Sequence, residues 1–503
     1  MLLSHFLKIR RKVYLDNNAT TSVLLSVARR MNHVLRKHYG NPSSLSHDAI
    51  KSSVIIDDSR AVIAETVNAD RSEIFFTGSA SEANNAVIKS LAEHSFPAKK
   101  KILSTPIEHA SVMSSLAYLE QKGFSIEYIP VDSKGRVLIE SFQQMIDEAT
   151  FLVCCMLANN EIGVIQDIKQ ITEIAHSKQV PVFSDCVQAL GKIPVDLKEL
   201  NVDYASFSAH KIHGPKGVGA MYVNSGSFIS SFIHGGHQEN GLRAGTESIH
   251  NIAGFAEACK NVKKNLKLSV KTKLIKDFFI NELIRIKPDI ILNSVLDENC
   301  LPNTVNVVFT GVNNAALMAA LDYFGIAVSA GSACNTQSND ASHVLKAIGL
   351  TDQQTRESIR FSLPADISKS QIKYVLSILE QAVSEKLPSI GMLEPKQLNE
   401  ELINHPDTLI VDVRFWHDRL IVKGIPNSRE INFFAFKKYF KHFPLDKNII
   451  LVCQGGFFAP IIGYAMKQHG YKNVQFLMLG IIGWQKANPE LYNKIAGKNI
   501  IKL

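Results

Sequence analysis

The chain has 503 residues, which is too long for one hydrophobic core and predicts roughly two to four domains. Apolar residues make up 46% of the sequence and charged residues 20%, proportions that exclude a disordered or low-complexity protein. The net charge of +8 is modest for this length, and no basic stripe is interleaved with aromatic residues, so we expect no nucleic acid among its partners.

The seven cysteines indicate a reducing compartment. Their number is odd and no two are spaced as Cys-x-x-Cys, so we expect neither a disulfide framework nor a zinc or other metal site. The first residues, "MLLSHFLKIRRK", place apolar before basic residues, the reverse of a secretory signal. A short mitochondrial presequence is the alternative, but a cytoplasmic protein is the prediction.

Strand-like runs and helical stretches alternate over residues of about 14–255. Apolar runs such as "TFLVCCMLANNEIG" and "QVPVFSDCVQA" each end in polar residues, and helical stretches lie between them. This alternation predicts a parallel sheet covered by helices, an α/β fold. Functional groups in such folds gather at the carboxyl ends of the strands, which is where His109, Asn160, Asp185 and Lys211 fall.

Four of these segments together have the chemistry of a pyridoxal phosphate site. "SFSAHKIHGPKGVG" places Lys211 after a strand, and "SDCVQ" places Asp185 at a strand end. "FTGSASEANN" opens a helix with Ser79 and Glu82 in capping-box spacing, and such a helix start binds phosphate. "TPIEHASV" places His109 after another strand. Lysine forms a Schiff base with this cofactor, aspartate keeps its ring nitrogen protonated, and a histidine such as His109 moves protons. Each residue alone is explained by a cap or a solvated surface, but the set is better explained by the cofactor.

Residues of about 256–385 predict a smaller α+β domain. Long helical stretches such as "KLSVKTKLIKDFFINELIRI" accompany two strand-like segments, "TVNVVF" and "IAVSAGS". Small and polar residues surround Cys334 in "SAGSACNTQSNDAS", a composition typical of an exposed loop. In contrast, Cys154, Cys155 and Cys259 are expected to be buried, small apolar residues.

The prolines of segment 386–397 predict a linker, and a third unit follows over 398–503. Residues 448–466 contain no charge and have about the length of a ~20-residue membrane span. However, Pro460 and the paired glycines before it favour a strand, a turn and the first turn of a helix. We therefore expect no membrane segment, and we place Cys453 at the turn.

Residues 13 to about 385 resemble a cysteine desulfurase of the NifS/IscS type, in the class-V, fold-type I group of pyridoxal phosphate enzymes. The motifs "YLDNNATT", "GNPSSLSH", "EHASV", "NNEIGVIQ", "SAHKIHGPKGVG", "GLRAGTE", "SAGSAC" and "IRFSL" occur in that family's order. The resemblance implies that residues 1–385 form a large and a small domain, that L-cysteine is converted to L-alanine, and that the protein is a homodimer.

The resemblance also assigns the catalytic roles. It makes Lys211 the Schiff-base lysine, Asp185 the partner of the pyridinium and Gln188 the hydrogen-bond donor to the ring phenolate. His109 would stack on the ring. Cys334 matches the cysteine that accepts sulfur as a persulfide.

The binding residues follow from the same resemblance. Four residues would bind the cofactor phosphate: Ala80, Ser81, Ser208 and His210. Asn160 and Arg360 match the substrate-binding positions, and a bidentate guanidinium suits a carboxylate. Thr246 matches a residue that one subunit donates to the neighbouring subunit's site.

Residues from about 393 to 503 resemble a rhodanese domain. "LIVDVR", "GIPNS", "IILVCQGG" and "NVQFLMLGIIGW" occur in its order, and the resemblance makes Cys453 a sulfur carrier. The family loop usually runs Cys-x-x-Gly-x-Arg-Ser, whereas Phe458 and Ala459 occupy the last two places here. An anionic donor such as thiosulfate would therefore be held less well.

Two hypotheses stay open for this third unit. In the first, Cys453 receives sulfur from Cys334, within one chain or across the dimer. It then passes the sulfur to an acceptor protein for iron–sulfur cluster, thio-cofactor or tRNA biosynthesis. In the second, the unit is a degenerate fold kept for docking, with Phe457 and Phe458 as contact surface.

For the first 385 residues, the alternatives are a selenocysteine lyase or another class-V lyase or aminotransferase, but the intact Ser-Ala-Cys loop favours the desulfurase.

Overall fold

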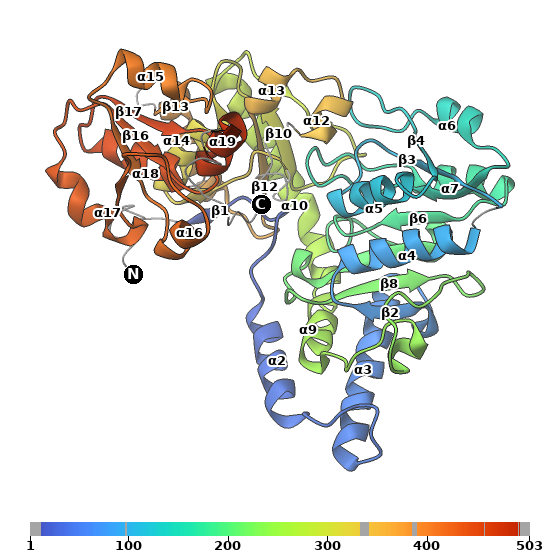
Figure 1. Ribbon diagram of the computed structural model, residues 1–503. Helices are drawn as coiled ribbons and strands as arrows, with labels where there is room; N and C mark the ends of the chain where they lie inside the picture. The colour runs from blue at the N-terminus through green and yellow to red at the C-terminus, as the bar shows by residue number, and fades with distance from the viewer. Residues whose placement is uncertain are drawn as a thin grey trace.

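The computed structural model describes residues 12–95, 98–331, 342–384, 390–456, 458–490 and 492. Within these residues, a seven-stranded, a three-stranded and a five-stranded sheet mark three successive units (Figure 1). The expected α/β class is confirmed.

The first unit is built on the seven-stranded sheet, in the order β2-β8-β7-β6-β5-β3-β4. The strands are β2 (Ile74–Thr77), β3 (Lys101–Ser104), β4 (Ser125–Tyr128), β5 (Thr150–Cys154), β6 (Val182–Asp185), β7 (Tyr204–Ser208) and β8 (Gly219–Val223). Neighbours from β4 to β7 pair in parallel, whereas β8 is antiparallel to both β2 and β7. The four parallel pairs bring the carboxyl ends of five helix-connected strands to one edge.

Helices cover both faces of this sheet, which explains its continuous apolar strands. On β5, Leu152 packs in one apolar cluster with α4 (Ala80–Ser95) and α5 (Ala110–Glu120). The next residue, Val153, packs in the opposite cluster, which contains residues of the helices that cover the other face. Those helices are α2 (Leu25–Lys37), α3 (His47–Thr66), α7 (Ile168–Ser177), α8 (Leu197–Leu200) and α9 (Ile249–Cys259), with α6 (Ile139–Met145) beside them.

The second unit has an antiparallel sheet of β9 (Ile291–Leu292), β10 (Thr304–Val308) and β12 (Ser358–Ser362). Its helices are α10 (Val262–Ile286), α11 (Asn314–Tyr323), α12 (His343–Ala347), α13 (Asp352–Arg356) and α14 (Lys369–Val383). Strand β1 (Val13–Tyr14) pairs with β11 (Ile326–Ala327). The N-terminal strand therefore belongs to the second unit, although the sequence pattern predicts that the large domain begins near residue 14.

The third unit has a parallel sheet in the order β13-β17-β16-β14-β15. The strands are β13 (Gly391–Leu393), β14 (Leu409–Asp412), β15 (Arg429–Glu430), β16 (Ile449–Val452) and β17 (Val474–Leu477). The helices are α15 (Leu398–Asn404), α16 (Trp416–Ile421), α17 (Phe433–Tyr439), α18 (Phe458–Gln468) and α19 (Gly480–Ala487). Because β13 pairs with β17, residues 391–393 of the segment assigned to a linker belong to this sheet.

Residues 448–466, the uncharged stretch long enough for a membrane span, contain β16 and most of α18. Among the described residues, no helix combines the length and apolar character that a bilayer crossing requires. The turn and helix expected around Pro460 are present, since α18 contains this proline in its first turn.

The third unit packs against the second through α11 and α18, whose side chains share one buried cluster. Tyr323 and Tyr464 are buried with ring centroids 5.2 Å apart. Ala319 and Ala465 belong to the same buried cluster. An ion pair at 3.6 Å between Arg356 and Glu394 also crosses this boundary. The two units are therefore held together by a buried apolar contact.

Gly480 gives a direct test of the packing in the third unit. Its φ is 52°, and a Cβ at this position would lie 1.8 Å from the carbonyl oxygen of Cys453. Gly480→Ala is expected to lower the free energy of unfolding of this unit by roughly 2–5 kcal/mol, because the backbone must move. Urea unfolding followed by tryptophan fluorescence measures it, since both tryptophans, Trp416 and Trp484, lie in this unit.

Gly470→Ala is the matched control. Gly470 also has a positive φ of 91°, but nothing lies within 4 Å of its Cβ position. This variant carries only the left-handed strain of roughly 1–2 kcal/mol. An equal loss in both variants would contradict the steric explanation.

Candidate functional site

Four residues predicted from the sequence lie where parallel strands end. Asp185 is the last residue of β6, and Lys211 lies in the short helix η2 (Ala209–Lys211) directly after β7. His109 is the N-cap of α5 after β3, and Asn160 follows β5. Since these strands are neighbours in the sheet, their carboxyl ends form one continuous edge.

Hydrogen bonds connect His109 with Asp185. The Ser111 backbone N–H donates to Nδ1 of His109 at 3.2 Å, so the proton of the neutral ring is on Nε2. Asn84 Nδ2 lies 2.9 Å from Ser111 Oγ and 3.1 Å from Asp185 Oδ2. Burial lowers the pKa of His109, and Lys211 lowers it further against the opposing effect of Asp185. The ring is therefore neutral near pH 7 and fixed in one tautomer.

The start of α4 is capped as expected, with one difference. Ser79 Oγ accepts from the backbone N–H of Glu82 at 3.1 Å. The Glu82 carboxylate, however, accepts from Gly78 N–H at 2.9 Å and pairs with Arg243 at 3.0 Å. Backbone N–H groups in the first turn of a helix lack intrahelical partners. The N–H of Ala80 is therefore available for an anion.

Gly219 shows how closely this helix start approaches β7. A Cβ at Gly219 would lie 2.8 Å from the backbone nitrogen of Ala80 and 2.7 Å from the carbonyl oxygen of Phe207. Ser208 ends β7 opposite Gly219, and His210 follows with Nδ1 3.1 Å from Thr20 Oγ1. Burial lowers the pKa of His210 to about 4, so its ring is neutral. The four predicted phosphate residues (Ala80, Ser81, Ser208 and His210) thus come from two segments that meet at Gly219.

The amino group of Lys211 faces the N-terminal loop. Its Nζ donates to the carbonyl oxygens of Asn18 at 2.6 Å and Ala19 at 2.8 Å. Gln188 Nε2 donates to the same Asn18 carbonyl at 3.0 Å. The predicted Schiff-base lysine and the predicted phenolate donor are therefore brought together by one backbone carbonyl group.

Arg360 is a buried cation in β12 with 1% of its surface exposed. Its Nη2 donates to Asp16 at 2.8 Å, and Nη1 donates to the carbonyl oxygen of Asn160 at 3.1 Å. Its Nε has no hydrogen-bond partner among the described residues. The two predicted substrate residues are thus in contact, and the guanidinium has a donor left for a carboxylate.

Cys334 lies outside the described residues, but the segment before it is fixed at the site. Ser329 and Arg360 form an antiparallel bridge in which Arg360 N donates to Ser329 O at 2.7 Å. Ala330 and Gly331 come directly after Ser329. Segment 332–341 therefore begins three residues after a backbone contact with the buried Arg360.

The segment after residue 341 is fixed at the same place. Ser342 Oγ donates to Glu161 Oε2 at 2.6 Å, and His343 Nε2 lies 2.9 Å from the carbonyl oxygen of Glu108. Both glutamates are direct sequence neighbours of predicted site residues. The two flanks of the cysteine-bearing segment thus adjoin the edge where the strand-end residues gather.

Cys453 follows β16 and is 1% exposed. It packs in an apolar cluster of the third unit, and its carbonyl oxygen accepts from Ile481 N–H at 2.9 Å. Arg414 is buried beside this loop and donates to Gln454 Oε1 at 3.2 Å, while Asp412 neutralises it at 2.8 Å. The loop contains no arginine of its own, as the sequence indicates.

Aromatic side chains surround the start of α18. Phe458 is 41% exposed, and its ring centroid lies 5.7 Å from that of Phe415. Trp416, which follows Phe415 in the sequence, is 66% exposed. Ala459 is buried, and Phe457 lies outside the described residues.

A cavity of 890 Å³ lies between the second and third units. One wall contains Ala330, Gly331 and Ser342, the residues that flank segment 332–341. The other wall contains Gly455 and Gly456, which follow Cys453 by two and three positions. The cavity therefore connects the surroundings of the two predicted sulfur-carrying cysteines.

Thr246 lies elsewhere, exposed between η3 (Gln238–Gly241) and α9.

Sequence reasoning missed four residues that organise this site: Asn18, Asn84, Ser111 and Lys192. Asn18, Asn84 and Ser111 each belong to a quoted motif, "YLDNNATT", "FTGSASEANN" and "TPIEHASV". Polar residues buried inside such motifs were the available signal. Their partners lie far away in sequence, so spacing alone did not identify them.

Known proteins are similar over both parts of the chain. The aminotransferase class-V family pattern matches residues 13–375, and the rhodanese-like domain pattern matches residues 394–487. Cysteine desulfurase IscS from Clostridium botulinum is 37% identical over 395 residues, covering 78% of this chain and all of that protein. The protein of the same name from Dictyoglomus turgidum is 38% identical over 384 residues, covering 76% and 97%.

Solved structures agree with this similarity. A NifS-like protein has a TM-score of 0.70 at 38% identity, covering 74% of this chain and 100% of that one. The structure titled SspA in complex with cysteine has a TM-score of 0.62 at 33% identity, covering 70% and 99%.

Glu108 makes stability depend on pH. It is fully buried, and Oε1 accepts from Thr105 Oγ1 at 2.7 Å and from Met156 N–H at 2.8 Å. Oε2 has no partner among the residues described. Burial raises the pKa of Glu108 from 4.5 to about 8. Because the folded pKa is the higher one, the protonated carboxyl contributes stability in full below about pH 4.5, and this contribution is lost as the pH rises through about 8.

Glu108→Gln is expected to remove this dependence. Between about pH 5 and pH 9 the wild type should lose on the order of a few kcal/mol relative to the variant, since glutamine does not ionise. Urea unfolding at several pH values measures the difference. Glu140→Gln, at an exposed position, is the control and should follow the wild type. Parallel curves for wild type and Glu108→Gln would contradict the assignment.

Proposed function

Since the chain belongs to the class-V aminotransferase family as a cysteine desulfurase with a C-terminal rhodanese-like domain, we propose that it performs a sulfur relay. Sulfur from L-cysteine passes as a persulfide from Cys334 to Cys453 and then to an acceptor protein. The main support for this proposal is the cavity between the second and third units. It is lined both by the flanks of segment 332–341 and by the glycines after Cys453. The units involved are the desulfurase, residues 1–385, and the rhodanese-like unit, 398–503 together with β13.

The family implies dependence on pyridoxal phosphate, and the residues of the first unit fit this group. Gly219 lets the start of α4 and the end of β7 approach closely, which brings the Ala80 N–H next to Ser208 and neutral His210. Asp185, which accepts a hydrogen bond from Asn84, would pair with the ring nitrogen, and Lys211 would be the covalent attachment point. When bound, the cofactor withdraws electrons from the substrate's α-carbon.

The residues around this group bind the substrate and move its protons. Arg360 holds the carboxylate, with Nε as the donor that its partners leave unused. His109 is fixed by Ser111, so that its Nε2 is the atom that exchanges protons. Overall, the C–S bond of L-cysteine breaks and an S–S bond forms on Cys334. L-alanine leaves, and Cys334 keeps the persulfide.

The second transfer requires no oxidant or reductant. The Cys453 thiolate attacks the terminal sulfur of the Cys334 persulfide, the old S–S bond breaks and a new one forms. Cys334 regains its thiol proton, and Cys453 carries the persulfide. The donor is a protein side chain, so the absence of the family's loop arginine at Phe458 has little effect. The N–H groups at the start of α18 stabilise the anionic persulfide.

Fixed packing of the two units supports transfer within one chain. The contact between α11 and α18 places the helix that follows Cys453 against the domain that carries Cys334. A tether of this kind raises the effective concentration of the acceptor thiol. Cys453 is also 1% exposed, so a persulfide there is shielded from thiols in solution.

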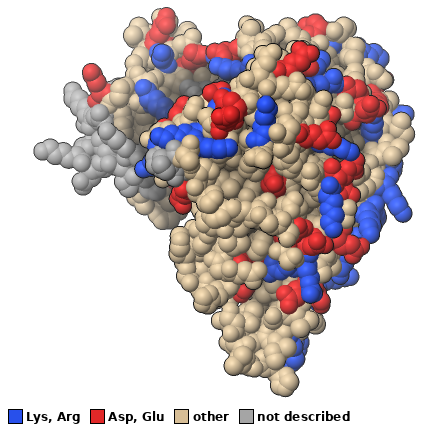
Figure 2. All heavy atoms as spheres, turned by 90° about the vertical axis from the view of Figure 1, so that its right-hand side faces the viewer, with Lys and Arg blue, Asp and Glu red and all other residues tan. Residues whose placement is uncertain are grey.

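The homodimer implied by the resemblance has support in exposed apolar residues. Leu45 is 98% exposed and Tyr39 is 76% exposed, in the segment between α2 and α3. Leu35 and Ile50 on the two helices are also exposed. On the face drawn in Figure 2, the lower end of the molecule, where Figure 1 places α2 and α3, shows few charged side chains. Apolar patches of this kind mark protein interfaces.

A second candidate function is a docking module. Phe415, Trp416, Leu420 and Phe458 form an aromatic and apolar set whose last three members are 41% or more exposed. Together with the buried thiol of Cys453, this set favours binding of an acceptor protein without sulfur transfer through the third unit. Persulfide mapping distinguishes the two functions.

The relay is tested by turnover with L-cysteine, trapping of persulfides by alkylation and peptide mass mapping. Persulfide is expected on both cysteines in the wild type. Cys334→Ala should lose both signals, and Cys453→Ala only its own. Ala319→Glu places a charge in the buried contact with α18 and should remove the Cys453 signal while Cys334 keeps its persulfide.

Ala98→Glu, at an exposed position of the first unit, is the matched control and should keep both persulfides. Cofactor absorbance confirms that each variant has a folded desulfurase. Persulfide on Cys334 alone in the wild type would overturn the relay and leave the docking module. Mixing Cys334→Ala with Cys453→Ala chains tests transfer between chains, and no Cys453 signal is expected.

Arg360→Lys tests the carboxylate clamp. Lysine keeps the charge near Asp16 but lacks the planar fork, so one charge-assisted hydrogen bond is lost. The KM for L-cysteine is expected to rise on the order of tenfold, with a smaller change in kcat. Steady-state alanine formation measures both constants. An unchanged KM would exclude Arg360 from substrate binding.

A further inference from the structure

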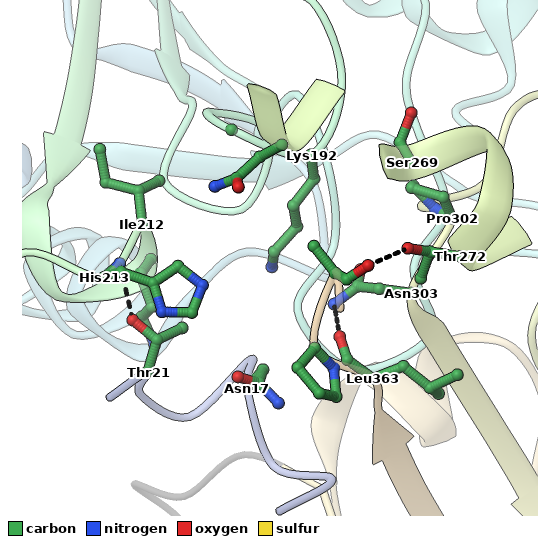
Figure 3. A pocket seen from close by; sticks show the side chains of 15 residues that line it. Asn17, Thr21, Lys192, Ile212, His213, Ser269, Thr272, Pro302, Asn303 and Leu363 are labelled. Atoms are coloured by element: carbon green, nitrogen blue, oxygen red, sulfur yellow. Dashed lines mark hydrogen bonds between the residues drawn. The ribbon is translucent and has the colours of Figure 1, made fainter. Parts of the chain in front are cut away.

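Lys192 is a half-buried lysine to which the desulfurase reaction assigns no role. Its Nζ donates to Asn18 Oδ1 at 2.8 Å and also to Gln188 Oε1. Figure 3 shows its side chain extending into a small cavity between His213 and Asn303. Lys211 lines the same cavity, so the two amino groups lie near one another.

The neighbours of Gln188 fix which way its amide points. The carbonyl oxygen of Asn18 only accepts hydrogen bonds, so the amide atom facing it at 3.0 Å is the nitrogen, Nε2. The other amide atom is then the oxygen, which needs a donor because Gln188 is buried. Lys192 is that donor. With one N–H used on Asn18, the second N–H of Nε2 remains for the phenolate oxygen of the cofactor.

The surroundings of Lys192 agree with this geometry. Burial of the amino group lowers its pKa well below 10.5, and the charges of Lys211 and Arg360 lower it further. In either charge state Nζ has enough N–H donors for the two amide oxygens of Asn18 and Gln188. The amino group therefore holds both amide oxygens at once.

We propose that Lys192 is a positioning residue of the cofactor site: it holds the amide oxygen of Gln188 so that the amide nitrogen faces the phenolate of pyridoxal phosphate. The inference rests on the proposed cofactor site. Without Lys192, Gln188 Oε1 is a buried acceptor with no donor from this side chain, and the amide rotates to find one. The hydrogen bond to the phenolate is then lost, although Gln188 is still present.

The visible absorbance of the Lys211-bound cofactor reports on this hydrogen bond. The wild type, Lys192→Met, Gln188→Leu and the double variant are loaded with pyridoxal phosphate and titrated with pH. Lys192→Met is expected to shift the titration midpoint by about half a pH unit or more, equivalent to roughly 0.7 kcal/mol, in the same direction as Gln188→Leu. The double variant should shift no further than Gln188→Leu alone, because Lys192 acts through Gln188.

Lys276→Met is the matched control for losing a buried lysine. Lys276 is 3% exposed and donates to the carbonyl oxygen of Leu301 at 3.0 Å, so its variant should leave the absorbance titration unchanged. Lys192→Gln, with a shorter polar side chain, replaces the methionine variant if that one does not fold. Additive shifts, or no shift in either Lys192 variant, would overturn the inference. A wild type without the absorbance band would instead overturn the proposed cofactor site.

Discussion

Burial of the large sheet on both faces is the constraint on which the site depends. Consecutive residues of β5, Leu152 and Val153, pack into opposite apolar clusters, so helices close both faces of the sheet. The backbone there is satisfied by parallel pairing, and functional side chains gather at the carboxyl ends of the strands. Asp185, Lys211 and His109 therefore converge without being close in sequence.

Arg360 connects this edge to the rest of the chain. Its guanidinium pairs with Asp16 of the N-terminal segment and with the carbonyl oxygen of Asn160 after β5. Its backbone pairs with Ser329, at the start of the segment that carries Cys334. One fully buried cation thus brings together the N-terminal loop, the first sheet, the second sheet and the cysteine-bearing segment.

The sequence predicts the fold class and the strand-end residues because both follow from local patterns. Apolar runs with polar ends locate the parallel strands, and residues such as Asp185 lie at their ends. The polar residues around them could not be derived in the same way. Asn18 is hydrogen-bonded by side chains of four distant segments, which contain Gln188 and Lys192, Lys211, Asn303 and Thr304, and Ser362. Lys192 contacts Gln188 through a local turn, and residue spacing does not predict the geometry of that turn.

Short strands could not be predicted from the sequence either, because they form through pairing with distant strands. β13 has three residues, Gly391 to Leu393, between prolines, and such a composition is typical of a linker. It becomes a strand only because β17 offers an unpaired edge in parallel register, with Met392 opposite Phe476. Tertiary pairing here overrides local preference, as it does for Tyr14 beside Ala327. Likewise, the sequence shows that Phe458 stands in place of the loop arginine, but the packing of α18 against α11, which supports the proposed relay, becomes visible only in the structure.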